Sequence, residues 1–205
     1  KFVIGSVFRN QGRKMADRQL EAFAKFAKDK DDVIFYLHCD PTDPAQTFNM
    51  LEFINDKNIN NKVLFSGMRY YKGFPVQKMR EVYNLMDCFF LSTSGEGFGV
   101  PTIEAMSCGV PVVITDYTTT KELIMEDGQS GEPVAIAEEL VGTYNVPRGV
   151  INTDDAARKL EKLYKDKELG KQYGANGRKK VVELYDYERV IGPMWERYLE
   201  EVLNA

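Results

Sequence analysis

The sequence predicts an α/β fold, in which a parallel β-sheet is covered by helices on both faces. Short apolar runs of strand length alternate with stretches of helical period over the first two thirds of the chain. The final third keeps only the helical period. With 205 residues, of which 43% are apolar and 28% charged, the chain can bury one sizeable core. We therefore expect a single globular domain.

Five apolar runs are expected to form the strands of the sheet. They are Phe2–Val7, Val33–His38, Val63–Ser66, Cys88–Ser92 and Val112–Thr115. Between the runs, apolar side chains recur every three to four residues, which indicates helices. The helices are expected over Lys14–Ala27, Gln46–Asp56, Val76–Met86 and Val100–Gly109. The sheet pattern fades after Gly131, and Glu132–Val150 is an excursion to which we assign no structure.

The remaining segments are predicted to be helical. One helix is expected to start near Thr119 or Thr120, and another after Asn152, because these side chains can accept hydrogen bonds from the first free amides of a helix. The last three helices are expected over Asp154–Lys165, Glu168–Glu183 and Asp186–Leu203. In the final helix, apolar side chains share one face, a pattern typical of a helix packed on a core. They are Met194, Trp195, Tyr198, Leu199 and Val202.

The most informative segment is the glycine-rich turn that follows the apolar run Cys88–Leu91. Its alternating glycines let the backbone approach a ligand closely, and the helix behind them offers free N–H groups to an anion. Glu96 lies in the turn, and Glu104 lies about one turn into the helix. Both carboxylates could accept hydrogen bonds from hydroxyl groups beside the anion. This combination suits a sugar nucleotide, whereas the simpler alternative is a tight turn with two solvated acids.

The turn also carries a family resemblance. The string Glu96-Gly97-Phe98-Gly99-Val100-Pro101, followed by Glu104-Ala105-Met106 and Gly109-Val110-Pro111-Val112-Val113, resembles the signature of retaining glycosyltransferases of family four, which have the GT-B architecture. The resemblance is close over residues 2–131 and holds only in outline for the helical tail. It implies that residues 1–205 form the carboxyl-terminal, Rossmann-like, nucleotide-sugar-binding domain of a GT-B enzyme.

The same resemblance implies a longer protein. The chain begins inside a strand pattern, without a leader or an initiating Met, so we expect a fragment of a longer chain. In the resembled family the terminal helices cross back onto the other domain. Residues 152–205 would accordingly be a helical tail that packs toward a missing amino-terminal domain, and part of its apolar face would be exposed here.

The resemblance assigns donor-binding roles to the residues that match the motif. Glu104 would bind the ribose hydroxyls and Glu96 a hydroxyl of the donor sugar. The amides of Gly99, Val100 and Thr102 are candidates for the diphosphate. Pro101 suits the first helical turn because its missing N–H would be free anyway. A first-turn acid that only stabilises the helix dipole is the alternative for Glu104. The predicted donor-binding set is Gly97, Phe98, Gly99, Val100, Pro101, Thr102 and Glu104.

Cations are expected at the turn after the first strand. Arg9 and Lys14 keep the spacing of an Arg and a Lys in the family's pattern, and together with Glu96 they are the predicted catalytic residues. Both cations should reach the diphosphate, which gains charge as the glycosidic bond breaks. A guanidinium can donate two hydrogen bonds to one phosphate, and an ammonium adds a point charge. A solvated basic turn is the alternative, and the role of Arg13 is left open.

Weaker signals border this site. Ser66–Arg69 follows the third strand and would border the nucleotide base, but mainly through its backbone, so the base is not specified. The threonines of Asp116–Leu123 stand in a loop where many family members carry two glycines, which puts detailed donor or acceptor contacts in question. His38, the one histidine, is expected to be structural. No cluster has metal-ligand spacing, so we expect no metal and no cofactor besides the donor substrate.

Composition limits the partners and the compartment. The net charge of -4 argues against a nucleic-acid groove, and no apolar run approaches the ~20 residues of a membrane span. Cys39, Cys88 and Cys108 lack metal spacing and fit reduced core thiols of a cytoplasmic protein. The expected partners are a nucleoside diphosphate sugar and the amino-terminal acceptor domain of the same chain. Peripheral association of the full-length enzyme with the cytoplasmic face of a membrane stays open.

Rival interpretations are weaker. A nicotinamide-binding domain needs a third glycine where Val100 stands, and no Gly-Lys-Ser/Thr follows a glycine loop, so a P-loop is excluded. A non-catalytic sugar-nucleotide-binding module and a related sugar-nucleotide epimerase stay alternatives, and no lysine has a recognisable pyridoxal context for a phosphorylase. The favoured interpretation is the donor-binding half of a retaining glycosyltransferase. It would transfer a sugar from a nucleoside diphosphate sugar to an acceptor, and the fragment alone would be inactive.

Overall fold

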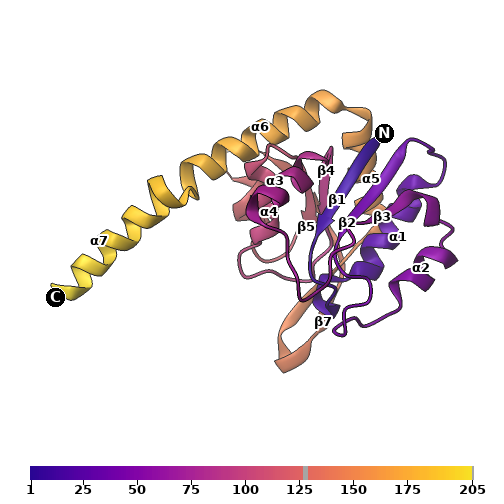
Figure 1. Cartoon of the computed structure of the whole chain (residues 1–205), viewed down its shortest axis with the longest axis horizontal. Coiled ribbons are helices and arrows are strands. Elements are labelled where there is room, and N and C mark those ends of the chain that lie inside the picture. The colour runs from indigo at the N-terminus through magenta and orange to yellow at the C-terminus, as the bar shows by residue number, and fades with distance from the viewer. Residues whose placement is uncertain (127–128, 205) are drawn as a thin grey trace.

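The computed structural model describes residues 1–126 and 129–204, and its centre is a six-stranded parallel sheet (Figure 1). The strand order is β3-β2-β1-β4-β5-β6. The strands are β1 Phe2–Val7, β2 Val33–His38, β3 Val63–Phe65, β4 Cys88–Leu91, β5 Val112–Thr115 and β6 Gly131–Val134. The five expected strands are confirmed to within one residue at each end. The sixth, β6, corrects the expectation that the sheet pattern fades after Gly131, because it pairs with β5 along its whole length.

Helices cover both faces of this sheet. The strand order reverses between β1 and β4, and right-handed crossovers then place α1 and α2 on one face and α3 and α4 on the other. β4 and β5 are buried along their whole length, which explains why they read as unbroken apolar runs. The helices are α1 Ala16–Ala27, α2 Met50–Asp56, α3 Val76–Asn84 and α4 Val100–Ser107.

Two of these helices start later than expected. The segment before α1 is a separate 3₁₀ turn, Gly12–Lys14, followed by Met15 in the left-handed region with φ 46°. Lys14 therefore lies outside the helix, and its side chain can turn toward the edge of the sheet. Helix α2 begins at Met50 because Asn49 caps it, with its Oδ1 accepting a hydrogen bond from the Glu52 amide at 3.2 Å.

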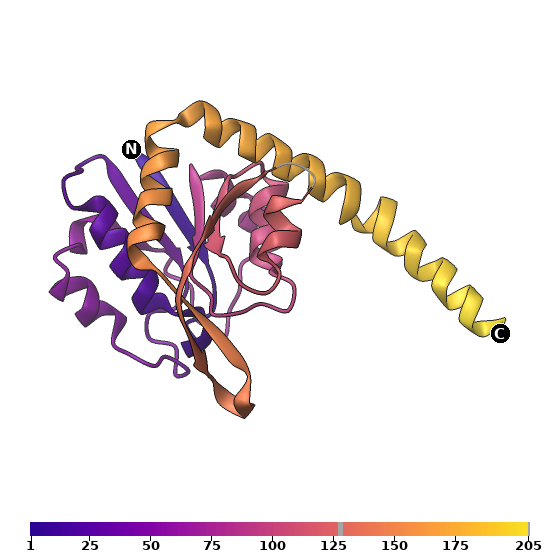
Figure 2. The same ribbon diagram turned by 180° about the vertical axis from the view of Figure 1, so that it is seen from behind.

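The segment after β6, for which no structure was expected, is an antiparallel hairpin. β7 Ile136–Val141 pairs with β8 Pro147–Ile151, and the hairpin extends beyond the rest of the domain (Figures 1 and 2). The helix expected near Thr120 is a single π-helical turn, Lys121–Met125. The predicted threonine cap is wrong, because the Thr120 hydroxyl donates to the carbonyl oxygens of Thr115 and Tyr117 instead.

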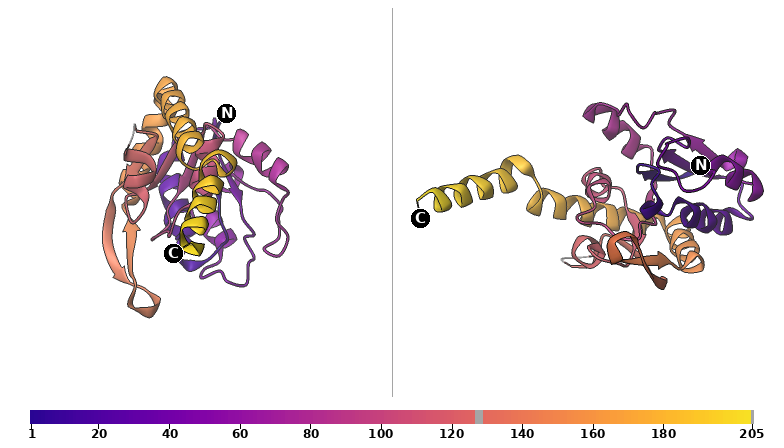
Figure 3. Two further views of the ribbon diagram at one scale, coloured as in Figure 1. Left: turned by 90° about the vertical axis from the view of Figure 1, so that its left-hand side faces the viewer. Right: turned by 90° about the horizontal axis from the view of Figure 1, so that it is seen from below.

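The three carboxyl-terminal helices differ in their packing. Asn152 caps α5 Thr153–Lys165 as expected, since its Oδ1 accepts from two amides at 3.0 Å, and α5 lies against α1 (Figure 2). Helix α6 Lys167–Leu184 packs on α4. A π-helical turn, Tyr187–Ile191, then leads into α7 Gly192–Leu203, which projects away from the sheet (Figure 3).

The apolar face of α7 is not part of the core. Its five predicted core residues, named above from Met194 to Val202, are 51–57% exposed, so the core assignment is wrong for this chain. The expected exposure of part of this face is found. Packing of residues 152–205 toward an amino-terminal domain stays a prediction, and α7 projects clear of the sheet (Figure 3).

The cysteines are unpaired. Cys39 and Cys88 are buried and Cys108 is partly buried. Burial raises the pKa of the Cys39 and Cys88 thiols, which makes them poor nucleophiles. His38 is 4% exposed and packs edge-on against Phe74, and burial lowers its pKa. Within residues 1–126 and 129–204, no helix is long and apolar enough to cross a membrane.

The contact between α6 and α4 depends on a glycine. A Cβ built on Gly174 would overlap the carbonyl oxygen of Gly109, which ends the α4 segment with φ +73°. We expect Gly174→Ala to lower the free energy of unfolding by about 1–3 kcal/mol, measured by urea denaturation, despite alanine's higher helix propensity.

Gly170, one turn earlier on the same helix, provides the matched control. A Cβ there would lie 3.8 Å from the Pro111 Cγ, an ordinary contact. Gly170→Ala should therefore raise the free energy of unfolding by about 0.5–1 kcal/mol through helix propensity. Equal effects of the two substitutions would contradict the close approach of α6 to α4.

Candidate functional site

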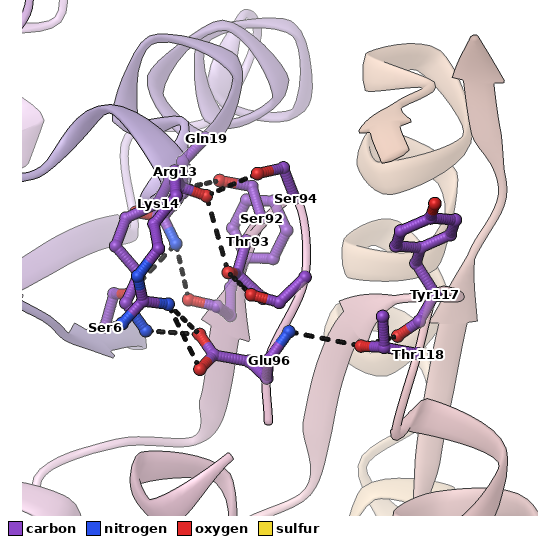
Figure 4. Close-up of polar contacts among 12 residues, drawn as sticks. Ser6, Arg13, Lys14, Gln19, Ser92, Thr93, Ser94, Glu96, Tyr117 and Thr118 are labelled. Atoms are coloured by element: carbon purple, nitrogen blue, oxygen red, sulfur yellow. Dashed lines mark hydrogen bonds and ion pairs between the residues drawn. The ribbon is translucent and has the colours of Figure 1, made fainter. Parts of the chain in front are cut away.

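The sheet topology brings the two predicted site segments together. β1 and β4 are parallel neighbours at the point where the strand order reverses, so the loops that follow them meet at the carboxyl edge of the sheet. The Ser94 amide and its hydroxyl both donate to the Arg13 carbonyl oxygen at 2.9 Å. The Ser92 hydroxyl donates to the Met15 carbonyl oxygen at 2.8 Å. The basic turn and the glycine-rich turn therefore form one connected unit (Figure 4).

Within this unit, two predicted catalytic residues form an ion pair. The Lys14 ammonium donates a hydrogen bond to Glu96 Oε1, and the Lys14 and Glu96 side chains are only 6% and 13% exposed. Arg13, whose role the sequence left open, reaches the same carboxylate, with its Nη1 3.2 Å from both oxygens (Figure 4). Two cations thus converge on one acid in the glycine-rich turn.

Burial and pairing act in opposite directions on this pair. Burial lowers the pKa of Lys14, and the Glu96 carboxylate opposes that shift only in part, so the pKa stays below its ordinary value. Burial alone would raise the pKa of Glu96, but the hydrogen bond and charge of Lys14 outweigh it, so this pKa is lowered. Glu96 is therefore ionised at neutral pH and acts as a hydrogen-bond acceptor.

Arg9, the third predicted catalytic residue, is held apart from this pair. Its Nε and Nη2 donate to the Asp43 carboxylate at 2.9 and 3.3 Å. Asp43 is fully buried, and the bond from Arg9 lowers its pKa. No motif in the sequence marks Asp43 as a partner of Arg9. The structure therefore does not bring Arg9 onto the carboxylate that Lys14 contacts.

Arg9 instead lines a pocket of about 340 Å³. Met68, from the segment expected to border a nucleotide base, lines the same pocket, and so does Pro101 at the start of α4. His38 and Asp40 also contribute to the wall. A segment after β1, a segment after β3 and the start of α4 thus enclose one space at the carboxyl edge of the sheet.

The start of α4 offers fewer free amides than expected. Gly99 occupies the N-cap with φ +96°, a conformation that favours glycine, and its carbonyl oxygen accepts from the Thr102 amide at 2.9 Å. The Thr102 amide is therefore engaged within the first turn, which corrects its assignment as a free donor. Among the residues that the structure describes, the amides of Gly99 and Val100 donate to no protein acceptor. Gly97 is open, because a Cβ there would meet nothing within 4 Å.

The remaining predicted binding residues lie around this helix start. Phe98 is 43% exposed and packs edge-on against Tyr185 with the ring centroids 5.5 Å apart. The exposed Glu104 accepts a hydrogen bond from the Tyr83 hydroxyl at 2.6 Å. Tyr83 is buried in α3, and burial together with Glu104 raises its pKa. Glu104 is thus held in place by a partner that its sequence position did not reveal, and one carboxylate oxygen stays available.

A threonine supports the glycine-rich turn from the other side. The Glu96 amide donates to the Thr118 hydroxyl at 3.1 Å (Figure 4). Thr118 has φ +57°, a left-handed conformation that β-branched residues rarely adopt. It belongs to the loop where the resembled family carries glycines. The threonine in place of a family glycine was the sequence signal that could have pointed to Thr118 as part of the site. A glycine has no hydroxyl and could not accept this hydrogen bond.

Similarity to known proteins agrees with this geometry. Residues 1–180 match the family described as "Glycosyl transferases group 1". The chain belongs to this family. Its fold is that of the carboxyl-terminal domain of GT-B glycosyltransferases. In the part of the chain that the structure describes, no group of three or more His, Cys, Asp or Glu side chains is placed to hold a metal ion.

Individual proteins align over most of the chain. It is 26% identical over 185 residues to "N-acetyl-alpha-D-glucosaminyl L-malate synthase" of Bacillus anthracis, covering 90% of this chain and 42% of that protein. The carboxyl-terminal domain of LpcC, a group 1 protein of Francisella tularensis, superposes with a TM-score of 0.68 at 21% identity, over 91% of this chain and 87% of that one. Anabaena Alr3699/HepE, crystallised with UDP, superposes with a TM-score of 0.74 at 19% identity, over 98% of this chain and 49% of that one.

The buried ion pair makes a prediction about stability. We expect Glu96→Gln to lower the free energy of unfolding by about 3 kcal/mol, because it leaves the buried Lys14 ammonium without a counter-charge. This value is at the lower end of the cost of breaking a buried ion pair, because glutamine still offers a carbonyl oxygen to Lys14. Urea denaturation monitored by circular dichroism measures the change.

An exposed pair on α3 serves as the control. Lys78 and Glu81 bond at 2.7 Å with side chains 57% and 63% exposed. Glu81→Gln should change the free energy of unfolding by less than about 0.5 kcal/mol. If Glu96→Gln costs no more than Glu81→Gln, then the Lys14–Glu96 pair is not the buried interaction described here.

Proposed function

We propose that this chain is the donor-binding half of a retaining glycosyltransferase, which transfers a sugar from a nucleoside diphosphate sugar to an acceptor. The observation that carries the proposal is the buried Lys14–Glu96 pair beside an open helix start, in a chain of the group 1 glycosyl transferases. The B. anthracis relative is named as a glucosaminyl malate synthase, and the Anabaena protein was crystallised with UDP. Both names favour a sugar nucleotide as the ligand.

The binding roles follow from which polar groups stay available. The Gly99 and Val100 amides, at the positive end of α4, would hold the diphosphate. The free oxygen of Glu104 would accept a hydrogen bond from a ribose hydroxyl. The pocket lined by Arg9, Met68 and Pro101 would take the nucleoside beside it. Gly97 and Phe98 would line the donor sugar through their backbone.

The reaction would use the ion pair as an exchangeable contact. As the bond from the anomeric carbon to the phosphate oxygen breaks, the diphosphate gains negative charge. Lys14 would then bond the phosphate, and Arg9 would add its unused guanidinium nitrogen. Glu96, released from Lys14, would accept a hydrogen bond from a donor-sugar hydroxyl. We assign neither Glu96 nor Glu104 as a covalent nucleophile, and the sugar would be transferred with retention at the anomeric carbon.

The wider setting is part of the same proposal. Arg9 and Lys14 would supply the positive charge at the diphosphate, so we propose no metal cofactor. The acceptor would bind across a cleft formed with an amino-terminal domain, and residues 1–205 alone would show no transfer. Buried free thiols fit a cytoplasmic protein, and the full-length enzyme could associate with the membrane surface from that side.

Donor binding is tested by a panel of UDP, GDP, ADP and their common sugar conjugates. A compound that binds only the native state raises its melting temperature, and calorimetry then gives the affinity. At least one member of the panel should bind with a dissociation constant in the micromolar range. No stabilisation by any member would reject the donor-binding role.

Glu104 gives the sharpest test of how the nucleotide is held. We expect Glu104→Gln to weaken binding of the best compound about tenfold, since a hydroxyl loses its bond to a charged acceptor. Tyr83→Phe should weaken it less, because only the positioning of Glu104 is lost. Glu196→Gln, on the exposed helix α7, is the control and should leave the calorimetric affinity unchanged.

The cations are tested by turnover in the full-length enzyme. Arg9→Ala and Lys14→Ala should each lower kcat about 10²-fold or more, because less charge faces the leaving diphosphate. Arg18→Ala, on the exposed surface of α1, should not. Wild-type kcat in both site variants would refute the leaving-group role, and an inverted anomeric configuration in the product, read by NMR, would refute retention.

A further inference from the structure

The β7–β8 hairpin is attached to the glycine-rich turn. The Gly149 amide on β8 donates to the Ser94 carbonyl oxygen at 3.1 Å. From the opposite strand, Glu139 accepts a hydrogen bond from the Tyr117 hydroxyl at 2.8 Å. A Cβ on Gly149 would lie 2.8 Å from the Tyr117 ring, so only glycine allows this approach. The hairpin is therefore fixed against the segment that carries Glu96, and it extends from there beyond the rest of the domain (Figure 1).

The hairpin brings a guanidinium to that segment. Arg148 Nη1 lies 3.2 Å from the place where a Cβ on Gly95 would stand. Its cross-strand partner is Leu140, not an acid. Among the described residues, no carboxylate oxygen lies within 4.0 Å of the Arg148 guanidinium. Glu139 on the same hairpin is bonded by Tyr117. Arg148 is therefore a half-buried guanidinium that no acid of the described residues pairs, in a chain of net charge -4.

Arg148 and Arg13 line the same pocket, of about 390 Å³. Arg13 contacts Glu96 through Nη1 alone and keeps 41% of its side chain exposed, so further N–H donors are available. Thr143 adds a hydroxyl to the wall, and the apolar Leu140 and Val141 face the same space. Two guanidinium groups and a hydroxyl beside apolar side chains match a small oxyanion carried by an organic molecule.

This pocket is separate from the one assigned to the nucleoside. No described residue lines both, and the pocket of Arg148 includes neither Lys14 nor any residue of α4. The proposed diphosphate contacts therefore lie outside it. Glu96, which would hold the donor sugar, is next to the pocket of Arg148, because Arg13 both lines that pocket and bonds the Glu96 carboxylate.

We propose that the pocket between the hairpin and the basic turn binds an anionic group, a phosphate or a carboxylate, of the sugar acceptor. The inference rests on the proposed function, since it places the acceptor next to the donor sugar at Glu96. Arg148 binds the anion directly, and Arg13 shares it. An acceptor held this way presents its hydroxyl near the anomeric carbon, while the apolar rim contacts the rest of the molecule.

The test follows the two arginines directly in the full chain. With ¹⁵N-labelled arginine, the Nε–Hε signals of Arg148 and Arg13 are followed during titration with sodium phosphate and, separately, sodium acetate. Sodium chloride of equal ionic strength is the blank. We expect a saturable shift at both signals that persists when the best nucleoside diphosphate is present in excess. The anion with the lower dissociation constant identifies the acceptor group as phosphate or carboxylate.

Substitutions give the matched comparison. Arg148→Gln should weaken anion binding, read at Arg13, at least about tenfold, whereas Arg80→Gln on the exposed face of α3 should leave it unchanged. The wild-type titration stands by itself if Arg148→Gln does not fold. An unsaturable shift, or one removed by the nucleoside diphosphate, overturns the proposal. Failure of the proposed donor site would instead appear as absent nucleotide binding in the calorimetric panel. It is therefore distinguishable from failure of the proposed anion pocket, which is read from the arginine signals.

Discussion

A lysine ammonium buried against a carboxylate organises the carboxyl edge of this sheet. Lys14 is 5% exposed, and a charge at that depth is tolerated only when an opposite charge and hydrogen bonds compensate the lost hydration. Glu96 supplies that compensation from a turn 82 residues further along the chain. The hydrogen bonds that hold the Glu96 segment in place therefore also determine the position of the Lys14 ammonium. The Ser94 and Ser92 bonds to the basic turn and the Thr118 bond to the Glu96 amide all serve this one contact.

The same constraint explains the irregular backbone around the pair. The chain leaves β1 and makes a 3₁₀ turn, and Met15 takes a left-handed conformation before α1 begins. A continuous helix from Lys14 would give that residue a helical backbone and a different side-chain direction. Thr118 holds a second left-handed conformation on the opposite side of Glu96. Strained residues flanking a buried charge are typical of a site held ready for a ligand.

Much of this arrangement could be predicted from the sequence, and the failures have identifiable causes. Unbroken apolar runs revealed β4 and β5, and the motif marked Glu96 and the start of α4. Strand β6 and the hairpin were not predicted because Gly131-Glu132-Pro133 lacks an apolar pattern. The buried Glu132 is stabilised by Lys159, Lys162 and Tyr173, which lie on helices further along the chain. The roles of Asp43 and Tyr83 were not predicted for a related reason. Each is far along the chain from its partner, Arg9 or Glu104, and meets it through the tertiary fold. The amphipathic face of α7 was mistaken for core because periodicity reports an apolar face and not what covers it.

The hairpin is inserted between β6 and α5 and forms a two-stranded sheet of its own. It leaves one residue after β6 ends and returns at Ile151, directly before the Asn152 cap of α5, and Ile136 pairs with Ile151 at its base. Glu139 and Gly149 attach the two strands to Tyr117 and Ser94, so it is the tip between them that can change in length or sequence while these attachments, β6 and α5 keep their places. The tip supplies Leu140, Val141, Gly142 and Thr143 to the proposed acceptor pocket, so changes there would alter the proposed acceptor recognition without moving the proposed donor contacts. This offers a physical route to diversification within a shared scaffold.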